Sequence, residues 1–467
     1  MARAEWGCGV ESVGDYERRL QDRILRPLVH AGRGWYLAFA ISGSMLLIGV
    51  VSFGWQLANG LVVTGMRDRI MWGLYITNFV FFIGISHAGT LISAILRTAQ
   101  AGWRTPVTRM AEFITVVALS VGGLMPMVDL GRPDRIPYLF LYGRWQSPIL
   151  WDLLAISTYI TGSVAYLYLP LIPDLAIARD RLGPTAGRWK AAFYRSASLG
   201  WTNTPRQRAL LHRAMTIMMV LIIPIAVSVH TVVSWIFAMT LREPWNSTVF
   251  GVFFVAGAIF SGIAVLILLM AALRKVYHLE EYLLEKHFVY LGYLIAAMAA
   301  IIFYFNISEY LVTGYKPNPE NQFQFNQMFR GEFAGFFWFY LFGGMVIPVL
   351  LIAFPRTRNI RGVLVAAALV TVAMWVERYF IVVASLRIPL LPYEPRTYIP
   401  TLTEIGITIG AFGLFVTMIL LFVRFIPVIS MWEQAEQHEG EARLMSAPVA
   451  AALPGAVSGA QPAGGRS

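Results

Sequence analysis

Long apolar segments recur along this sequence and restrict its possible folds more than any other feature. Each is about 20 residues long, enough for a helix to cross a hydrocarbon core of about 30 Å. They occupy residues 35–57, 71–97, 110–129, 148–171, 213–240, 248–273, 288–313, 332–354, 362–385 and 401–425. A transmembrane β-barrel would show short alternating segments instead. The sequence, 57% hydrophobic, therefore predicts an all-α integral membrane protein with about ten transmembrane helices.

Charged residues divide the chain into three parts and predict its orientation. A ten-helix membrane domain at 35–427 lies between an N-terminal segment, 1–34, and a C-terminal tail, 428–467. Lys and Arg gather in both terminal segments and in alternate loops, so the positive-inside rule places both termini in the cytoplasm. The net charge of +11 is thus explained by topology and does not indicate nucleic acid. The part of this tail after Arg443 is rich in Ala, Gly and Pro, and the tail is expected to be largely disordered.

A short internal repeat predicts how the spans are grouped. Residues 88–95 and 256–263 both begin with Ala-Gly and carry a serine at the sixth position. The two copies are four spans apart, so they run in the same direction through the membrane. We therefore expect two parallel four-helix units, spans 2–5 and 6–9, flanked by spans 1 and 10. The small residues would allow close helix packing.

The segment 125–152 joins spans 3 and 4 and carries two carboxylates at membrane-helix ends. Asp129 closes span 3, and Asp152 lies one turn into span 4, where Ser147-Pro148 predicts a helix start. Ionisable groups at this depth are costly and by default indicate function, here proton handling at the outer face. The alternative is structural, because both carboxylates could pair with the arginines at 132, 135 and 144.

Other ionisable residues are expected inside the spans. His230 and Arg378 approach the same outer half, Glu309 and Glu377 could form a proton pathway, and His87 lies deeper in span 2, as a structural or a pocket residue. A haem held by two histidines needs two imidazoles that face each other at matching depth. Because His87 and His230 are expected at different depths, no haem is predicted.

Cys8 is the single cysteine and lies outside the spans. One thiol cannot hold an iron–sulfur cluster in this chain. No metal site is predicted either. The alternative functional class is a secondary transporter or an ion-translocating subunit, because parallel repeats and buried carboxylates are also features of those proteins. The prolines fall mostly at span ends, which counts against the helices broken at the midplane that transporters often have.

Six motifs, taken together and in order, resemble the NrfD/polysulfide-reductase membrane subunits. They are HAGTLISAILR (87–97), the GRP of VDLGRP (128–133), SPILWD (147–152), SVHTVVSW (228–235), VAGAIFSG (255–262) and ERYFIVVASL (377–386). Within that family the chain is most similar to the ActC subunits of bacterial alternative complex III. The nearest alternative is the paralogous ActF-like subunit without an active quinol site.

The resemblance implies a multi-pass subunit of the bacterial cytoplasmic membrane that binds and oxidises a quinol, with menaquinol expected. The subunit would hold no redox cofactor and would not be active alone. Expected partners are an iron–sulfur subunit (ActB-like), an ActF-like paralogue, multihaem cytochrome c subunits (ActA- and ActE-like), small membrane subunits and lipids. Electrons would reach a cytochrome c-type acceptor and protons would leave at the outer face, with a contribution to proton translocation left open.

The resemblance also assigns residues to the quinol site. The expected catalytic residues are Asp152, Asp129 and His230, and the quinol-binding residues are these three with Arg378 and His87. The chain departs from the family pattern at two positions. Relatives often have histidine where Asp129 stands and an acidic residue where Ile236 stands, so the proton acceptors of this pocket are expected to be arranged differently.

Overall fold

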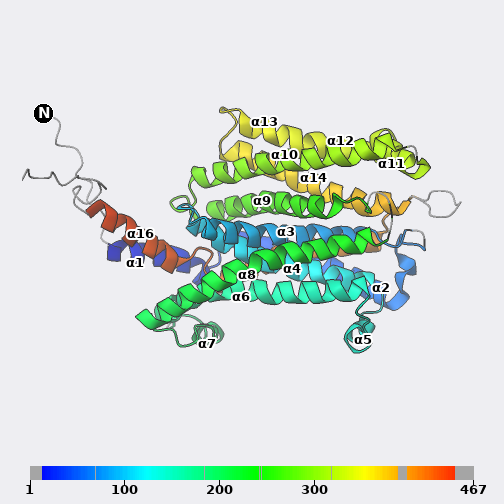
Figure 1. Ribbon diagram of the computed structural model, residues 1–467. Coiled ribbons are helices and arrows are strands. Elements are labelled where there is room, and N and C mark those ends of the chain that lie inside the picture. Colours follow the sequence, from blue (N-terminus) through cyan, green and yellow to red (C-terminus); the bar gives the residue numbers. More distant parts are fainter. Residues whose placement is uncertain are drawn as a thin grey trace, which may run out of the picture.

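The computed structural model describes residues 13–446 except residues 69, 184, 241, 243, 244, 317 and 388–396. All regular elements in this part of the chain are helical, and ten are long and apolar enough to span a membrane (Figure 1). The spans are α2 (Arg33–Asn59), α3 (Leu74–Thr98), α4 (Thr105–Asp129), α6 (Pro148–Leu182), α8 (Pro205–Ala238), α9 (Phe250–Tyr277), α10 (Glu285–Tyr315), α12 (Ala334–Leu341) continued by α13 (Ile347–Ala353), α14 (Ile360–Arg387) and α15 (Leu402–Phe425). The predicted all-α membrane architecture is confirmed.

Two helices run well past the apolar ranges that predicted them. α6 has 35 residues and α8 has 34, so both continue beyond the hydrocarbon core. α8 begins at a capping box, in which the Thr204 hydroxyl accepts from the Gln207 main-chain N–H. Apolar length marks the membrane-embedded part of a helix and says little about where the helix itself ends.

The eighth span is interrupted by a π-helical turn. Phe342–Val346 separates α12 from α13, and it contains Gly343 and Gly344. Pro348 follows in α13 and cannot donate a main-chain hydrogen bond to the preceding turn. The wider turn is a usual response to such a loss.

α3 is the most buried span and organises the bundle. In Figure 1 it runs through the middle, with α9, α10 and α14 on one side and α4, α6 and α8 on the other. It packs against α9 through the repeated motif. Gly84 faces Ala258 and Ser261, while Ala88 faces Gly262. Because these partners advance together along both helices, α3 and α9 run parallel, as the repeat predicts.

The two flanking spans pack against each other. On α2 and α15, Gly49 faces Gly410 and Ser52 faces Gly406. These pairs run in opposite order along the two helices, so α2 and α15 are antiparallel. Glycine allows the two backbones to approach closely here. The first and last spans thus form one pair, which also contacts α4 and α3.

Short helices mark the two ends of the bundle. One end carries α1 (Val13–Val29), α7 (Arg188–Ala197) and α16 (Met431–Ser446), and we call it the terminal face (Figure 1). The other end carries α5 (Ile136–Leu141) and α11 (Pro319–Phe329), and we call it the loop face. Under the positive-inside prediction, the terminal face is cytoplasmic.

Within the predicted tail, residues 428–467, residues 431–446 form α16. The expectation that the tail is largely disordered stays a prediction. Residues 447–467 lie outside the described part of the chain. The first part of the tail, unlike the Ala-, Gly- and Pro-rich end, is rich in the helix formers Glu, Gln and Ala. Contacts with buried charged side chains of the bundle also stabilise this helix.

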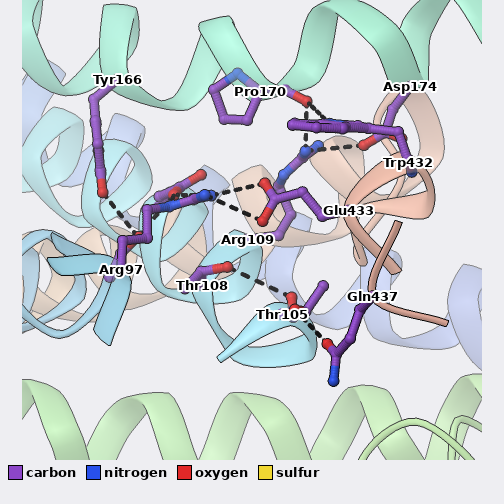
Figure 2. A network of polar contacts seen from close by, with 12 residues as sticks. Arg97, Thr105, Thr108, Arg109, Tyr166, Pro170, Asp174, Trp432, Glu433 and Gln437 are labelled. Carbon is purple, nitrogen blue, oxygen red and sulfur yellow. Dashed lines mark hydrogen bonds and ion pairs between the residues drawn. The ribbon is translucent and has the colours of Figure 1, made fainter. Parts of the chain in front are cut away.

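A polar network holds α16 against the terminal face (Figure 2). Arg97 pairs with Glu112 and with Glu433 of α16, each at 3.0 Å. Asp174 pairs with Arg109 at 2.9 Å, and its second oxygen accepts the main-chain N–H groups of Met431 and Trp432. A carboxylate that accepts the first N–H groups of a helix acts as a cap. Without α16, these buried groups would lose partners.

Candidate functional site

An elongated cavity of about 570 Å³ opens near the loop face. Its walls come from the loop-face ends of α3, α4, α6 and α8, from α5, and from Leu414 and Met418 of α15. Leu414 is 12 residues into α15, or about 18 Å along it at 1.5 Å per residue, so the cavity reaches toward mid-membrane. Leu124 and Ile149 line it yet are 43% and 52% exposed. The cavity therefore opens sideways, toward the surrounding lipid.

Asp129 lies at the polar end of this cavity. It is the last residue of α4, and the preceding Val128 is held by Gln56, whose side-chain amide donates to the Val128 carbonyl at 2.9 Å. Tyr75 in turn donates to the Gln56 side chain. These contacts fix the end of α4. The Asp129 Oδ1 atom is buried and has no hydrogen-bond partner in the described part of the chain.

Asp152 lines the same cavity from the start of α6. Ser147 is at the N-cap position and Pro148 at the first helical position, as predicted, although the Ser147 hydroxyl makes no capping hydrogen bond. The helix start thus places the carboxylate through the rigid proline backbone. Among the residues described, nothing donates a hydrogen bond to the buried Asp152 Oδ1 atom.

The structural alternative for these carboxylates was pairing with the arginines of the intervening loop. Arg132 instead makes a two-bond contact with Asp134, at 2.8 and 2.9 Å, on the exposed surface. No ion pair between the described residues involves Asp129 or Asp152. The two carboxylates are therefore available to a ligand in the cavity.

The predicted histidines lie together in a separate buried cluster. The rings of His87 and His230 are 4.3 Å apart. His87 Nδ1 lies 2.8 Å from the Ile83 carbonyl oxygen and Nε2 lies 2.7 Å from that of Ala226. A neutral imidazole has one N–H and therefore donates to only one of these two carbonyl oxygens. His230 Nε2 contacts the Phe254 carbonyl oxygen at 3.1 Å, and its Nδ1 is without a partner in the described chain.

The prediction that these histidines lie at different depths is wrong. Distance along each apolar segment was a poor guide, because α8 extends past the membrane and the helices are offset from each other. Three of the four ring nitrogens face main-chain carbonyl oxygens, which is not the arrangement of two axial haem ligands. The expectation that this chain holds no haem stays a prediction.

Arg378 and Glu377 occupy the same cluster from α14. Both are fully buried, and Arg378 Nη1 lies 3.2 Å from the Glu377 Oε2 atom. The guanidinium lies over the Phe254 ring at 4.9 Å. Gly257 leaves room for it, because a Cβ atom there would be 2.5 Å from Arg378 Nη2. Gly257, the glycine of the second copy of the repeat, thus provides the space that the Arg378 guanidinium occupies.

Aromatic side chains separate this cluster from the cavity. Trp72 and Phe237 line the cavity and contact each other at 5.3 Å. Behind them, Phe254 contacts Phe237 at 5.9 Å and His230 at 4.7 Å. The structure therefore brings Asp129 and Asp152 together, and brings His87, His230, Arg378 and Glu377 together, but divides the two groups. Glu309 does not line the cavity and accepts the Ser247 hydroxyl at 2.6 Å.

Sequence reasoning missed a carboxylate near the loop-face end of the bundle, Glu404. It accepts the main-chain N–H groups of Gly65 and Thr401, at 2.7 and 2.9 Å, and the Tyr398 hydroxyl. Burial, and then the Glu404 charge, raise the pKa of Tyr398, so the phenol remains a donor. The Thr401-to-Glu404 spacing of a capping box was the available signal. These bonds satisfy Glu404 and mark it as structural.

No group of three or more His, Cys, Asp or Glu side chains that could hold a metal occurs in the described ranges. Cys8 lies outside them. The departure at Ile236 is located in the cavity wall. An acidic side chain at that position would therefore add a third carboxylate to the cavity.

Comparison with known proteins gives consistent matches over most of the chain. The sequence profile of the family described as "Polysulphide reductase, NrfD" matches residues 62–389. A candidate dimethyl sulfoxide reductase membrane subunit from Halobacterium salinarum is 26% identical, over 89% of this chain and 96% of the relative. A selenate reductase subunit from Mesobacillus selenatarsenatis is 25% identical, over 87% and 97%. The menaquinone reductase integral membrane subunit of Nitratidesulfovibrio vulgaris is 22% identical, over 81% and 90%.

Proposed function

The chain belongs to the NrfD, polysulphide reductase family, and from that premise we propose that its loop-face cavity binds and oxidises a quinol. The protein is a multi-pass integral membrane subunit. Its similarity to a menaquinone reductase integral membrane subunit supports a quinone substrate, and menaquinol is the one we favour. The named substrates of the relatives differ, so we expect the terminal acceptor to be chosen by partner subunits.

One observation carries this proposal: two unpaired carboxylates lie in a long, largely apolar cavity that opens to lipid. A quinol has the matching form, with two ring hydroxyls at one end and an isoprenoid tail. Asp129 and Asp152 supply acceptors for the hydroxyls, and residues such as Ile156, Leu414 and Met418 supply apolar contact for the tail. A pocket orients a small molecule when polar side chains contact its polar head and apolar side chains contact its apolar body.

The chemistry requires acceptors for two protons and two electrons. Oxidation breaks both O–H bonds of the quinol and leaves two carbonyl groups on the ring. In our proposal one proton passes to the Asp152 carboxylate and the other to Asp129, acting as general bases. The two electrons pass to an iron–sulfur partner. Asp152 is one helical turn from the loop face, which gives its proton a short route to the outer water.

The electron acceptor is expected to dock on the loop face, over residues 130–147 and 314–331. Beside the cavity, α5 and the following loop expose Tyr138, Phe140, Tyr142 and Trp145, the last two at 76% and 74%. Exposed aromatic clusters of this kind are typical of partner surfaces. An ActB-like iron–sulfur subunit fits there, with ActA- and ActE-like cytochromes beyond it and an ActF-like paralogue within the membrane.

The buried histidine cluster has a different role in this proposal. His230 and Arg378 lie behind Phe237 and Phe254, so they act on the quinol site through these rings and not by contact with the quinol. Ionisable groups with unsatisfied atoms in a membrane interior are candidates for proton transfer. We assign His87, His230 and Glu377, with Glu309 further along, to a second route for protons.

Photolabelling of the assembled complex tests quinol binding. A menaquinone analogue that carries an azide on its ring should label peptides from residues 119–130 and 148–160, and excess menaquinol should suppress the label. Ser120→Phe fills the cavity wall and should abolish labelling. Ser44→Phe is the matched control, because both serines donate to the carbonyl four residues earlier and Ser44 does not line the cavity. Equal labelling of the two variants would show that the quinol does not bind in this cavity.

A further inference from the structure

A second large cavity lies at the terminal face, at the opposite end of the bundle from the quinol site. Its volume is about 700 Å³, and it is enclosed by α1, the start of α2, the end of α9 and the end of α15. Five of its lining residues are basic: Arg23, Arg26, His30, His278 and Arg424. None of the lining residues described is acidic. The cavity is therefore a concentrated positive site, and the proposed quinol chemistry makes no use of it.

Two of the arginines are held in place by main-chain carbonyl groups. Arg23 donates to the His278 carbonyl at 2.8 and 3.2 Å. Arg424 donates to the carbonyls of Pro27 and Val29 at the end of α1. These bonds tie α1 to α9 and α15 and leave the positive charges uncompensated. The side chains of Arg26 and His30 make no hydrogen bond or ion pair with any residue that the structure describes.

The cavity lies at the depth of lipid headgroups. α2 begins at Arg33, α9 ends at Tyr277 and α15 ends at Phe425, so three spans meet the membrane surface around it. Trp35 lies beneath the Arg424 guanidinium at 5.6 Å, and its indole N–H donates to the Leu420 carbonyl. Tryptophan at a span end is typical of the membrane interface. Below it, Ala38 and Leu420 give the cavity an apolar floor.

We propose that this cavity binds the phosphate headgroup of an anionic phospholipid, with an acyl chain lying along α2 and α15. Guanidinium groups bind phosphate through paired hydrogen bonds, and basic pockets between spans on the cytoplasmic side bind anionic headgroups. The apolar floor favours a lipid over a free phosphate or an acidic peptide, neither of which has an acyl chain to cover it. The lipid would join α1 to the ends of three spans.

The test is lipid binding to the full-length purified protein after delipidation, followed by native mass spectrometry. Phosphatidylglycerol, phosphatidylcholine and inorganic phosphate are added separately. Phosphatidylglycerol should bind well below the concentration at which phosphatidylcholine binds, and inorganic phosphate should not compete at millimolar concentration. Arg26→Gln should weaken phosphatidylglycerol binding about fivefold, the effect of one surface cation on an anionic lipid.

Arg33→Gln is the matched control, because Arg33 is exposed at the start of α2 and does not line the cavity. It should leave phosphatidylglycerol affinity unchanged. Equal binding of phosphatidylcholine would overturn the anionic specificity, and competition by phosphate would indicate an ion site without a lipid. If Arg26→Gln and Arg33→Gln weaken binding alike, the lipid responds to overall charge and this cavity is not its site. If Arg26→Gln does not fold, the comparison of phosphatidylglycerol, phosphatidylcholine and inorganic phosphate on the unmodified protein still tests whether the site prefers an anionic lipid.

Discussion

Gly262 shows how far a single missing side chain can determine the packing of this bundle. It lies in the repeated motif where α9 crosses α3, and a Cβ atom there would overlap with the Ala88 Cβ and lie 2.8 Å from the Ile85 carbonyl oxygen. The nearest atoms belong to the α3 backbone and to a short side chain, and neither can rotate away. Relief would require the two helices to separate.

We expect Gly262→Ala to destabilise the protein by about 1–3 kcal/mol, the usual cost of overpacking. Thermal unfolding of the purified protein should show a lower midpoint. Gly54→Ala is the matched control, since Gly54 is inside a span and a Cβ atom there would meet nothing within 4 Å. The control should be neutral or stabilising, because alanine favours helix more than glycine does. Equal midpoints for the two variants would mean that α3 and α9 do not meet at this motif.

Individual site residues could be predicted from the sequence when one loop held them together. Asp129 and Asp152 bracket a short connection, so their shared position at one end of the bundle followed from topology alone. His230 and Arg378 belong to distant spans, and the sequence gives no direction for their side chains around each helix axis. Phe254, which separates them from the cavity, looked like any other apolar residue. Glu404 was missed because a capping carboxylate resembles a loop residue.

At the scale of elements, α16 is a terminal helix docked by charge. Burial alone would disfavour its Glu433 carboxylate, but the Arg97 guanidinium and its hydrogen bonds hold the pKa of Glu433 below its usual value of 4.5. A lowered pKa in the folded state adds stability above the unfolded pKa, and this stability is lost as the pH falls through the lowered value. Docking of α16 should therefore persist at neutral pH and fail only in acid below about 4.5.

We expect Glu433→Gln to weaken α16 docking by about 3–5 kcal/mol, because it leaves the buried Arg97 charge with one carboxylate fewer. Hydrogen exchange at pH 7 should become faster across residues 431–439. Glu436→Gln is the matched control on the same helix, where the carboxylate is exposed and lies 3.6 Å from His212. Exposed pairs contribute little, so exchange should stay slow. Slow exchange in Glu433→Gln would show that the ion pair does not hold the helix.

At the scale of the whole molecule, the sequence determined the membrane class, the number of spans and the parallel arrangement of α3 and α9. The membrane class and the number of spans follow from apolar length, and the parallel arrangement follows from the repeated motif, whose two copies are an even number of spans apart. The pairing of α2 with α15, the π-helical turn in the eighth span and the docking of α16 depend on contacts between residues far apart in sequence. No periodicity within one segment contains that information. Orientation across the membrane remains a prediction from charge.

The central claim is that the two carboxylates of the loop-face cavity accept the protons of a quinol. Asp152→Asn keeps the shape and a hydrogen-bonding group but cannot accept a proton. General-base catalysis contributes about 10²–10⁴-fold, so quinol oxidation by the assembled complex should slow by about that factor while photolabelling of the cavity persists. Asp134→Asn is the matched control, because Asp134 is exposed and pairs with Arg132 in the same loop.

Steady-state quinol oxidation should therefore be measured on purified complexes that contain all subunits and differ only at these two positions. We predict a severe loss of turnover in Asp152→Asn and near wild-type turnover in Asp134→Asn. Near-normal turnover in a fully assembled Asp152→Asn complex would contradict the account.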